Sequence, residues 1–194
     1  MIMAHPDAEK WDAIYRSGGH QRQQPARVLK NYAHLLPAAG KALEPACGNG
    51  ANAVYLAQQG LETSAWDISR EAIHGLDDRA GQMGLQINTR ICDVVSNPPP
   101  ENSFDVIVVT YFLERQLIPH LIRALKPRGL LFYQTFIRER VDNTGPGNEK
   151  YCLAANELLQ LCRDLHILLY HEEGLLGNTR QGFRNEAMLI GQHN

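Results

Sequence analysis

Three carboxylates stand where three successive apolar runs of this sequence end, and a glycine-rich turn follows the first of them. The acids are Glu44, Asp67 and Asp93, and the turn contains Gly48 and Gly50. Glycine permits a tight turn and a close approach of the backbone to a ligand. An acid after a second strand suits the hydroxyls of a ribose. An acid after a third strand can accept a hydrogen bond from an adenine amino group, and one after the first can face an ammonium group or organise the loop. The pattern predicts an acceptor-lined crevice.

Such a crevice requires the ends of several strands to meet at one edge of a sheet. From residue 41 onward, short apolar runs alternate with amphipathic stretches, which predicts a mostly parallel sheet with helices on both faces. Ligands of these sheets bind outside the carboxyl ends of the strands, where the strand order reverses. We expect strands at 41–44, 61–66, 85–92, 104–109, 130–135, 167–170 and 186–190, and helices at 51–59, 70–80, 116–125 and after 156, with Ser69 and Asn156 as N-caps.

Composition and charge exclude several classes of protein. The 194 residues carry 19 basic and 21 acidic side chains, so we expect no basic face for nucleic acid. The first residues lack the pattern of a signal peptide, and no apolar run is long enough to cross a bilayer. We expect a cytoplasmic monomer or homodimer that acts on a small molecule away from membranes. The four cysteines show no zinc-ligand spacing, so we expect reduced thiols and no metal site.

The glycine turn and its surroundings resemble a known family. Residues 42–53, ALEPACGNGANA, are similar to motif I of class I S-adenosylmethionine-dependent methyltransferases, an acid followed by x-x-C/G-x-G. Asp67 and Asp93 fall on the next two cofactor positions of that family, and 121–130, LIRALKPRGL, is similar to its L-K-P-G-G turn. Within the family, the stretches WDAIY (11–15), NAVYLA (52–57) and AWDIS (65–69) resemble the small tellurite-resistance and thiopurine methyltransferases.

This resemblance implies a Rossmann-like, doubly wound α/β fold. Its sheet would have seven strands, mostly parallel with the last antiparallel. Residues 1–40 would form a helical cap and residues 41–194 the core of a single domain. The sequence departs from the family pattern in two places: Pro45 and Ala46 stand where many relatives have Leu and Gly, and Arg128 replaces the first glycine of the usual pair. Neither change removes a polar cofactor contact.

The resemblance also implies how S-adenosylmethionine, the expected cofactor, is bound. The first acid and the turn glycines would hold the methionine part and the loop backbone, and Asp67 would bind the ribose. Ile68 would pack on adenine, Asp93 with Val94 would read its edge, and Thr110 would lie beside the methionine. Trp11 and Tyr15 either close over the cofactor or serve ordinary helix packing. The full expected set is Trp11, Tyr15, Glu44, Ala46, Cys47, Gly48, Gly50, Asn52, Asp67, Ile68, Asp93, Val94 and Thr110.

Methyl transfer from a sulfonium is an in-line displacement that needs alignment more than acid–base catalysis. No catalytic pair is evident in the sequence, so we assign no catalytic residue. A soft nucleophile, such as a thiol or a tellurium or selenium oxyanion, reacts without a strong base. For the two arginines among the candidates, the alternative is a solvated loop position. The candidate substrate-pocket residues are Tyr111, Arg115, Gln134, Phe136 and Arg180.

Two other functions stay open. The spacing G-x-G-x-x-A also matches a dinucleotide fingerprint, which indicates a nicotinamide-dependent oxidoreductase, although Glu44 beside the turn would repel a pyrophosphate. A non-catalytic module that binds S-adenosylmethionine also fits. The run NPPP at 97–100 is similar to the N-P-P-Y/F motif of amino-group methyltransferases. It precedes the expected fourth strand and lacks the aromatic residue, so we interpret it as a loop.

Overall fold

Seven strands form among the residues that the computed structural model describes, 6–19 and 23–194. Six of them begin and end within two residues of the bounds expected from the sequence. The fifth begins at Leu125 rather than at Leu130, because Leu125 already pairs with Phe104 on the preceding strand, before a bulge. Arg128 within this stretch has a φ of +66°, the left-handed conformation that glycine favours. The arginine therefore adopts a backbone conformation that is usually left to glycine.

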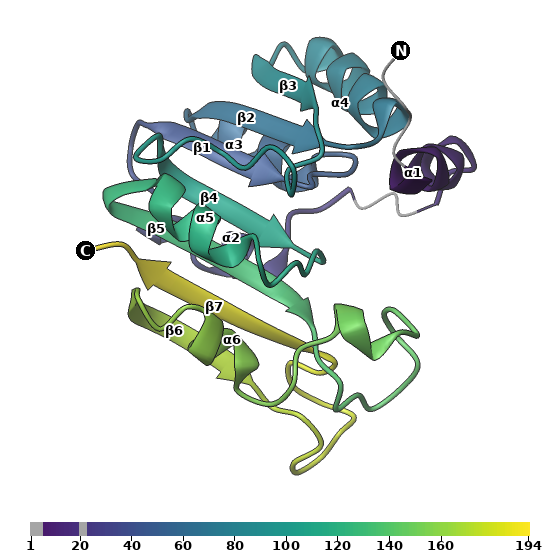
Figure 1. The fold of residues 1–194 in the computed structure, drawn as a ribbon, viewed down its shortest axis with the longest axis vertical. Helices are drawn as coiled ribbons and strands as arrows, with labels where there is room; N and C mark the ends of the chain where they lie inside the picture. The colour runs from purple at the N-terminus through teal and green to yellow at the C-terminus, as the bar shows by residue number, and fades with distance from the viewer. Residues whose placement is uncertain (1–5, 20–22) are drawn as a thin grey trace. The chain divides into compact units, whose positions relative to one another are not determined.

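The first compact unit, Met1–Pro98, is built on three parallel strands. Its elements are α1 (Pro6–Arg16), α2 (Arg27–Asn31), η1 (Ala33–Leu35), β1 (Lys41–Pro45), α3 (Ala51–Gln58), β2 (Glu62–Asp67), α4 (Arg70–Gln82) and β3 (Ile87–Ile91). The strands lie in the order β3-β2-β1, and β2 pairs in parallel with both neighbours (Figure 1). Buried side chains of strands and helices, including Ala53, Ala65, Ile73 and Leu76, form its core. The carboxyl ends of the three strands consequently share one edge.

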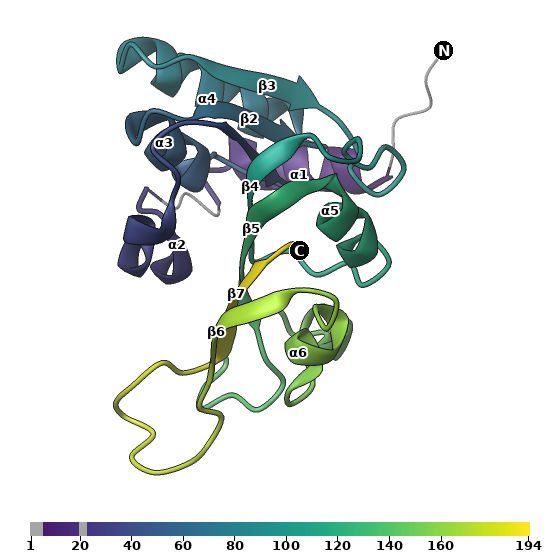
Figure 2. The ribbon, with the colours of Figure 1, turned by 90° about the vertical axis from the view of Figure 1, so that its left-hand side faces the viewer.

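The second compact unit, Pro99–Asn194, contains the other four strands. Its elements are β4 (Phe104–Thr110), α5 (Ile118–Ala124), β5 (Leu125–Phe136), η2 (Glu149–Tyr151), α6 (Glu157–Leu161), β6 (His166–Glu172) and β7 (Glu186–Gln192). β4 and β5 are parallel, whereas β7 runs antiparallel to both β5 and β6. Figure 2 shows α5 and α6 on the same side of β5, β7 and β6. Apolar strand residues of this unit, such as Val108 and Phe132, are fully buried.

The parallel order β3-β2-β1 in the first unit, and the order β4-β5-β7-β6 with only β7 reversed in the second, confirm the predicted Rossmann-like α/β class. Helices also occupy much of the described chain before β1. The assignment of residues 1–40 as a cap on one domain stays a prediction. Residues 97–100 form a loop before β4, as expected.

The predicted helix ends are only partly correct. Ser69 is the N-cap of α4, and its hydroxyl accepts a hydrogen bond from the Ala72 amide at 3.2 Å. Asn156 stands at the N-cap of α6, but its φ is +59° and its side chain makes no capping hydrogen bond. The expected capping by this side chain is therefore wrong, because a left-handed backbone, rather than an extended one, turns the chain into the helix. α5 is shorter than predicted, and Pro119 lies in its first turn.

Two whole-chain features bear on later arguments. All four cysteines, Cys47, Cys92, Cys152 and Cys162, are buried free thiols. No helix within residues 6–19 and 23–194 combines the length and the apolar character needed to span a bilayer.

Candidate active site

Three residues of the turn between β1 and α3 have a left-handed backbone conformation. Ala46, Gly48 and Gly50 have φ angles of +51°, +52° and +66°. The Gly50 carbonyl begins the hydrogen bonding of α3 by accepting from the Val54 amide at 2.9 Å. A Cβ atom at Gly50 would lie 2.5 Å from a methyl carbon of Leu76 on α4. Only glycine therefore fits there, for conformation and for space.

Glu44, near the end of β1, holds the start of α3 through two hydrogen bonds. One carboxylate oxygen accepts from the Asn52 side-chain amide and the other from the Ala53 backbone amide, both at 2.7 Å. The Asn52 side chain in turn accepts from the Ala26 amide at 2.8 Å. Burial raises the pKa of Glu44 to about 8, against the opposite effect of these N–H donors. Of the two roles that the sequence left open for this acid, the contacts favour organising the loop and the first turn of α3.

Asp67 links the end of β2 to the glycine turn. Its Oδ2 accepts from the Gly48 amide at 2.7 Å, and its Oδ1 accepts from the Ser69 amide at 2.9 Å. The side chain is buried, and burial raises its pKa despite these donors. A carboxylate has about four lone-pair positions, so these two bonds leave capacity for two ribose hydroxyls. The acid and the glycine turn are thus held together before any ligand binds.

Helix α1 is fastened to the start of α4. Oδ1 of Asp12 accepts from the Ser69 hydroxyl at 2.6 Å and from the Glu71 amide at 3.2 Å. Arg16 adds an ion pair with Glu71 at 2.7 Å. A carboxylate at a helix N-terminus satisfies free amides and interacts favourably with the helix dipole. The sequence did not predict these contacts, which fix the direction of α1 across the unit.

This docking places Tyr15 directly on the glycine turn. A Cβ atom at Gly48 would overlap the Tyr15 hydroxyl. Burial, and then the charge of Asp67, raise the pKa of Tyr15. The Trp11 ring lies 6.0 Å from the Tyr15 ring, centroid to centroid, and is partly buried. Both readings of these aromatic residues, covering a cofactor or packing the helix, are compatible with this position.

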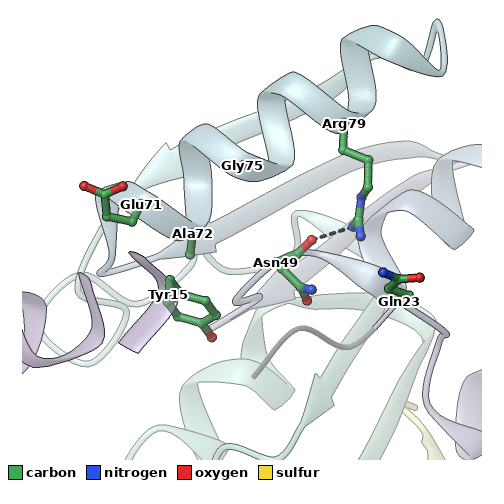
Figure 3. Close-up of a pocket in the computed structure, with 7 residues that line it drawn as sticks. All are labelled: Tyr15, Gln23, Asn49, Glu71, Ala72, Gly75 and Arg79. Carbon is green, nitrogen blue, oxygen red and sulfur yellow. Dashed lines mark hydrogen bonds between the residues drawn. The ribbon is translucent and has the colours of Figure 1, made fainter. Parts of the chain in front are cut away.

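A cavity of about 250 Å³ opens beside the same turn. Figure 3 shows Gly75 and Arg79 on α4, with Arg79 reaching toward Asn49 of the turn. The guanidinium donates to the Asn49 carbonyl at 2.5 Å, and its buried Nε has no acceptor among the described residues. Of the cofactor residues expected from the sequence, only Tyr15 borders this cavity. The lining residues are Tyr15, Gln23, Asn49, Glu71, Ala72, Gly75 and Arg79.

The residues after β3 form a compact turn. The two carboxylate oxygens of Asp93 accept from the Val95 amide at 3.0 Å and from the Ser96 hydroxyl at 2.5 Å. Val94 is buried, and Ile68, at the end of β2, is partly buried. The roles of Asp93, Val94 and Ile68 toward adenine stay predictions.

In the second unit, the structure brings three of the expected substrate residues together, Tyr111, Gln134 and Phe136, and adds Glu186 to them. The Gln134 amide nitrogen donates to the Tyr111 hydroxyl at 3.0 Å and to Oε2 of Glu186 at 2.5 Å. The Tyr111 ring lies 5.2 Å from that of Phe136. Thr110 ends β4 in register with Gln134. Glu186 was not a sequence candidate, because only the pairing of β5 with β7 brings it to this edge.

The two candidate arginines have different surroundings. Arg115 forms a two-pronged ion pair with Glu157, at 2.6 and 3.0 Å, and donates to the carbonyls of Lys150 and Cys152. These contacts fasten the segment after β5 to the end of β4. Arg180 lies exposed in the loop between β6 and β7. The contacts of Arg115 favour a structural role, and the substrate role of both arginines stays a prediction.

Two solved structures with the same fold belong to differently named proteins, TehB and a cyclase. TehB of Haemophilus influenzae aligns with a TM-score of 0.71 at 24% identity, over 93% of this chain and 66% of that one. The [4+2]-cyclase SpnF aligns with a TM-score of 0.74 at 16% identity, over 98% of this chain and 96% of that one. Identities this low establish the fold alone, and a cyclase among the neighbours means that the fold does not fix the reaction.

The glycine turn after β1, the acids at the ends of β1 and β2, and the strand order define a protein of the class I methyltransferase type. The chain belongs to the family of the tellurite resistance protein TehB, whose family model matches residues 25–185. It is 29% identical over 138 residues to a Haemophilus influenzae TehB described as a probable S-adenosyl-L-methionine-dependent methyltransferase. That match covers 68% of this chain and 48% of the relative, so the chain spans about half the length of that protein.

Proposed function

We propose that this chain transfers a methyl group from S-adenosylmethionine to a small-molecule acceptor. The observation that carries the proposal is the contact between Asp67 and the Gly48 amide, because it holds a ribose-binding acid against the glycine turn of motif I. The family membership and the name of the Haemophilus relative support the same cofactor. The cofactor supplies an electrophilic methyl group on a positively charged sulfur.

The donor set of the first unit fits this cofactor. The buried acids at the ends of β1 and β2 can accept hydrogen bonds from hydroxyl groups, and a positively charged ligand would favour their ionised forms against the burial that raises their pKa values. The same acids disfavour the pyrophosphate of a nicotinamide cofactor, for which a helix N-terminus without acids is suited. In this proposal Glu44 and Asn52 hold the loop that receives the methionine part, Asp67 binds the ribose, and Ile68 and Asp93 bind the adenine.

Helix α1 supplies the cover in this proposal. Tyr15 lies on Gly48 and so occupies space above the turn, and we infer that it and Trp11 move aside or pack against the bound cofactor. The acceptor would bind at the carboxyl ends of β4 and β5, where Thr110, Tyr111, Gln134 and Phe136 gather, because ligands of open α/β sheets bind at that edge. The expectation of a thiol or a tellurium or selenium oxyanion as acceptor, and of a monomer or homodimer, stays a prediction.

Calorimetry tests the cofactor assignment. We expect the wild type to bind S-adenosylhomocysteine and not NAD. Asp67→Ala should weaken the binding of S-adenosylhomocysteine by about 1–3 kcal/mol, the cost of leaving ribose hydroxyls unpaired. Asp67→Asn keeps an oxygen that can accept from the Gly48 amide. Comparing it with Asp67→Ala therefore separates the loss of ligand contacts from disruption of the turn. Asp78→Asn, an exposed acid on α4, is the matched control and should bind normally.

Two results would count against this function. Unchanged affinity for S-adenosylhomocysteine in Asp67→Ala would remove the acid from the site, and binding of NAD by the wild type would favour the oxidoreductase alternative. Conversion of S-adenosylmethionine to S-adenosylhomocysteine in the presence of methyl acceptors then distinguishes an enzyme from a module that only binds the cofactor.

A further inference from the structure

A carboxylate stands at the carboxyl edge of the second unit, held by two neutral side chains. Oε2 of Glu186, the first residue of β7, accepts from the Gln134 amide at 2.5 Å and from the Tyr111 hydroxyl at 3.3 Å. Gln134 also donates to the Tyr111 hydroxyl. We call Tyr111, Gln134 and Glu186 the carboxylate cluster. Its members come from the ends of β4 and β5 and the start of β7, which share this edge.

Backbone and ring contacts of Tyr111 hold the carboxylate cluster in place. Tyr111 has a φ of +57°, which is an outlier for an aromatic residue, and its amide donates to the Gln134 carbonyl at 2.9 Å. The Tyr111 ring packs on Phe136, which pairs with Glu186 across β5 and β7. A strained backbone that persists in a well-packed region indicates a functional constraint.

Within the part of the chain that the structure describes, Glu186 has no cationic partner. Among residues 6–19 and 23–194, no lysine, arginine or histidine forms an ion pair with it, and its second oxygen, Oε1, accepts no hydrogen bond from them. Glu186 is only partly buried, so Oε1 is open to solvent or to a ligand. The cluster therefore presents a negatively charged hydrogen-bond acceptor at the edge where such sheets bind ligands.

We propose that Glu186 selects a methyl acceptor that carries a proton on its attacking nitrogen or oxygen, and that it takes this proton during the reaction. This inference rests on the proposed function. The acceptor would donate its N–H or O–H to Oε1, while Tyr111 and Gln134 hold Oε2. The lone pair of the attacking atom forms the new bond to the methyl carbon, and the electron pair of the carbon–sulfur bond stays with the sulfur. The displaced proton passes to Oε1.

The same carboxylate opposes an oxyanion acceptor. Tellurite and selenite carry negative charge and, when deprotonated, offer no proton to Oε1, so Glu186 would repel them. A thiolate is excluded for the same reason, and a neutral thiol is a weak hydrogen-bond donor. The cluster thus favours an amine, phenol or alcohol over the soft nucleophiles expected from the sequence.

Three proteins test this inference: the wild type, Glu186→Gln and Glu101→Gln. The control variant removes one negative charge from an exposed turn of the same unit, where Glu101 pairs with Arg123 on the surface. All three should bind S-adenosylhomocysteine with equal affinity in calorimetry. Failure of the wild type to bind it would count against the proposed function itself, whereas the acceptor assays below address Glu186.

Release of S-adenosylhomocysteine is then measured with amines, phenols, alcohols, thiols, selenite and tellurite. We expect turnover with an N–H or O–H acceptor, a decrease of about 100-fold or more in Glu186→Gln, as for the loss of a general base, and no change in Glu101→Gln. Turnover with selenite, tellurite or a thiol that is unaffected by Glu186→Gln would overturn the inference. So would turnover of an amine or hydroxyl compound that does not depend on Glu186.

Binding provides a second measurement that does not require turnover. The same compounds are screened by ligand-detected NMR against the protein saturated with S-adenosylhomocysteine. The inference requires at least one N–H or O–H compound that binds the wild type and Glu101→Gln and loses binding in Glu186→Gln. A screen in which no compound shows this dependence would equally overturn it.

Discussion

Gly48→Ala adds a methyl group at a position that disfavours it for two reasons. The backbone of Gly48 is left-handed, and the Tyr15 side chain already occupies the space. Gly48 has a φ of +52°, and an L-residue in that conformation costs about 1–2 kcal/mol. The new carbon would overlap the Tyr15 hydroxyl and lie 3.2 Å from the ring carbon that carries it. Overpacking of this kind costs about 1–3 kcal/mol. We therefore expect the free energy of unfolding to fall by about 2–5 kcal/mol.

A second substitution separates the two contributions. Tyr15→Phe removes the overlapping hydroxyl but keeps the ring, so Gly48→Ala in that background should cost only the backbone share. The difference is a coupling of about 1–3 kcal/mol between the two positions. Gly60→Ala is the matched control, because Gly60 has a φ of +88° and, apart from its chain neighbours, no atom of the described residues lies within 4 Å of the added carbon. Its cost should be the same in both backgrounds.

Urea unfolding measures these free energies. Circular dichroism and tryptophan fluorescence should give coincident transitions if unfolding is two-state, and the slopes should match among the variants if only stability has changed. An equal cost of Gly48→Ala in the wild-type and Tyr15→Phe backgrounds would refute the reasoning. That result would mean that α1 does not lie on the glycine turn in solution.

Three further predictions concern charges. Because burial raises the pKa of Glu44 from 4.5 to about 8, unfolding releases its proton between these values. Stability should then fall by up to about 1.4 kcal/mol per pH unit as the pH rises through that window, and urea titrations of Glu44→Gln should lack this slope. Arg115→Lys should lower the free energy of unfolding by about 1–3 kcal/mol, since lysine cannot reproduce the fork on Glu157; an unchanged urea midpoint would contradict this. Asp12→Ala should speed amide hydrogen exchange in α1 more than in β1 or β2, and equal protection in the variant would show that Asp12 does not fasten the helix.

The sequence was sufficient for the parts of the site that are local. An acid at the end of a strand, with two glycines after it, predicts a tight turn, and Glu44, Gly48 and Gly50 lie at such a turn. The alternation of apolar runs likewise located β1 to β4 closely. The register of β2 then brings Asp67 to Gly48, 19 residues away in the chain.

Contacts between distant segments could not be predicted in the same way. Glu186 meets Gln134 and Tyr111 across separations of 52 and 75 residues, and its neighbours in the sequence only indicate an apolar strand. Arg115 resembled a substrate residue because it follows β4, but Glu157, 42 residues later, binds its guanidinium. These partners depend on how β7 and the segment before α6 fold back, which no local spacing encodes.

The burial of all four cysteines makes the folded protein a convenient host for chemical probes. Burial raises the pKa of each thiol, so little thiolate is present at neutral pH to react with maleimides or iodoacetamides. A single cysteine introduced at Leu176, whose side chain is 83% exposed in the loop before β7, would therefore take up a fluorophore or spin label selectively. Movements of that loop on addition of a methyl acceptor can then be followed without first removing the native thiols.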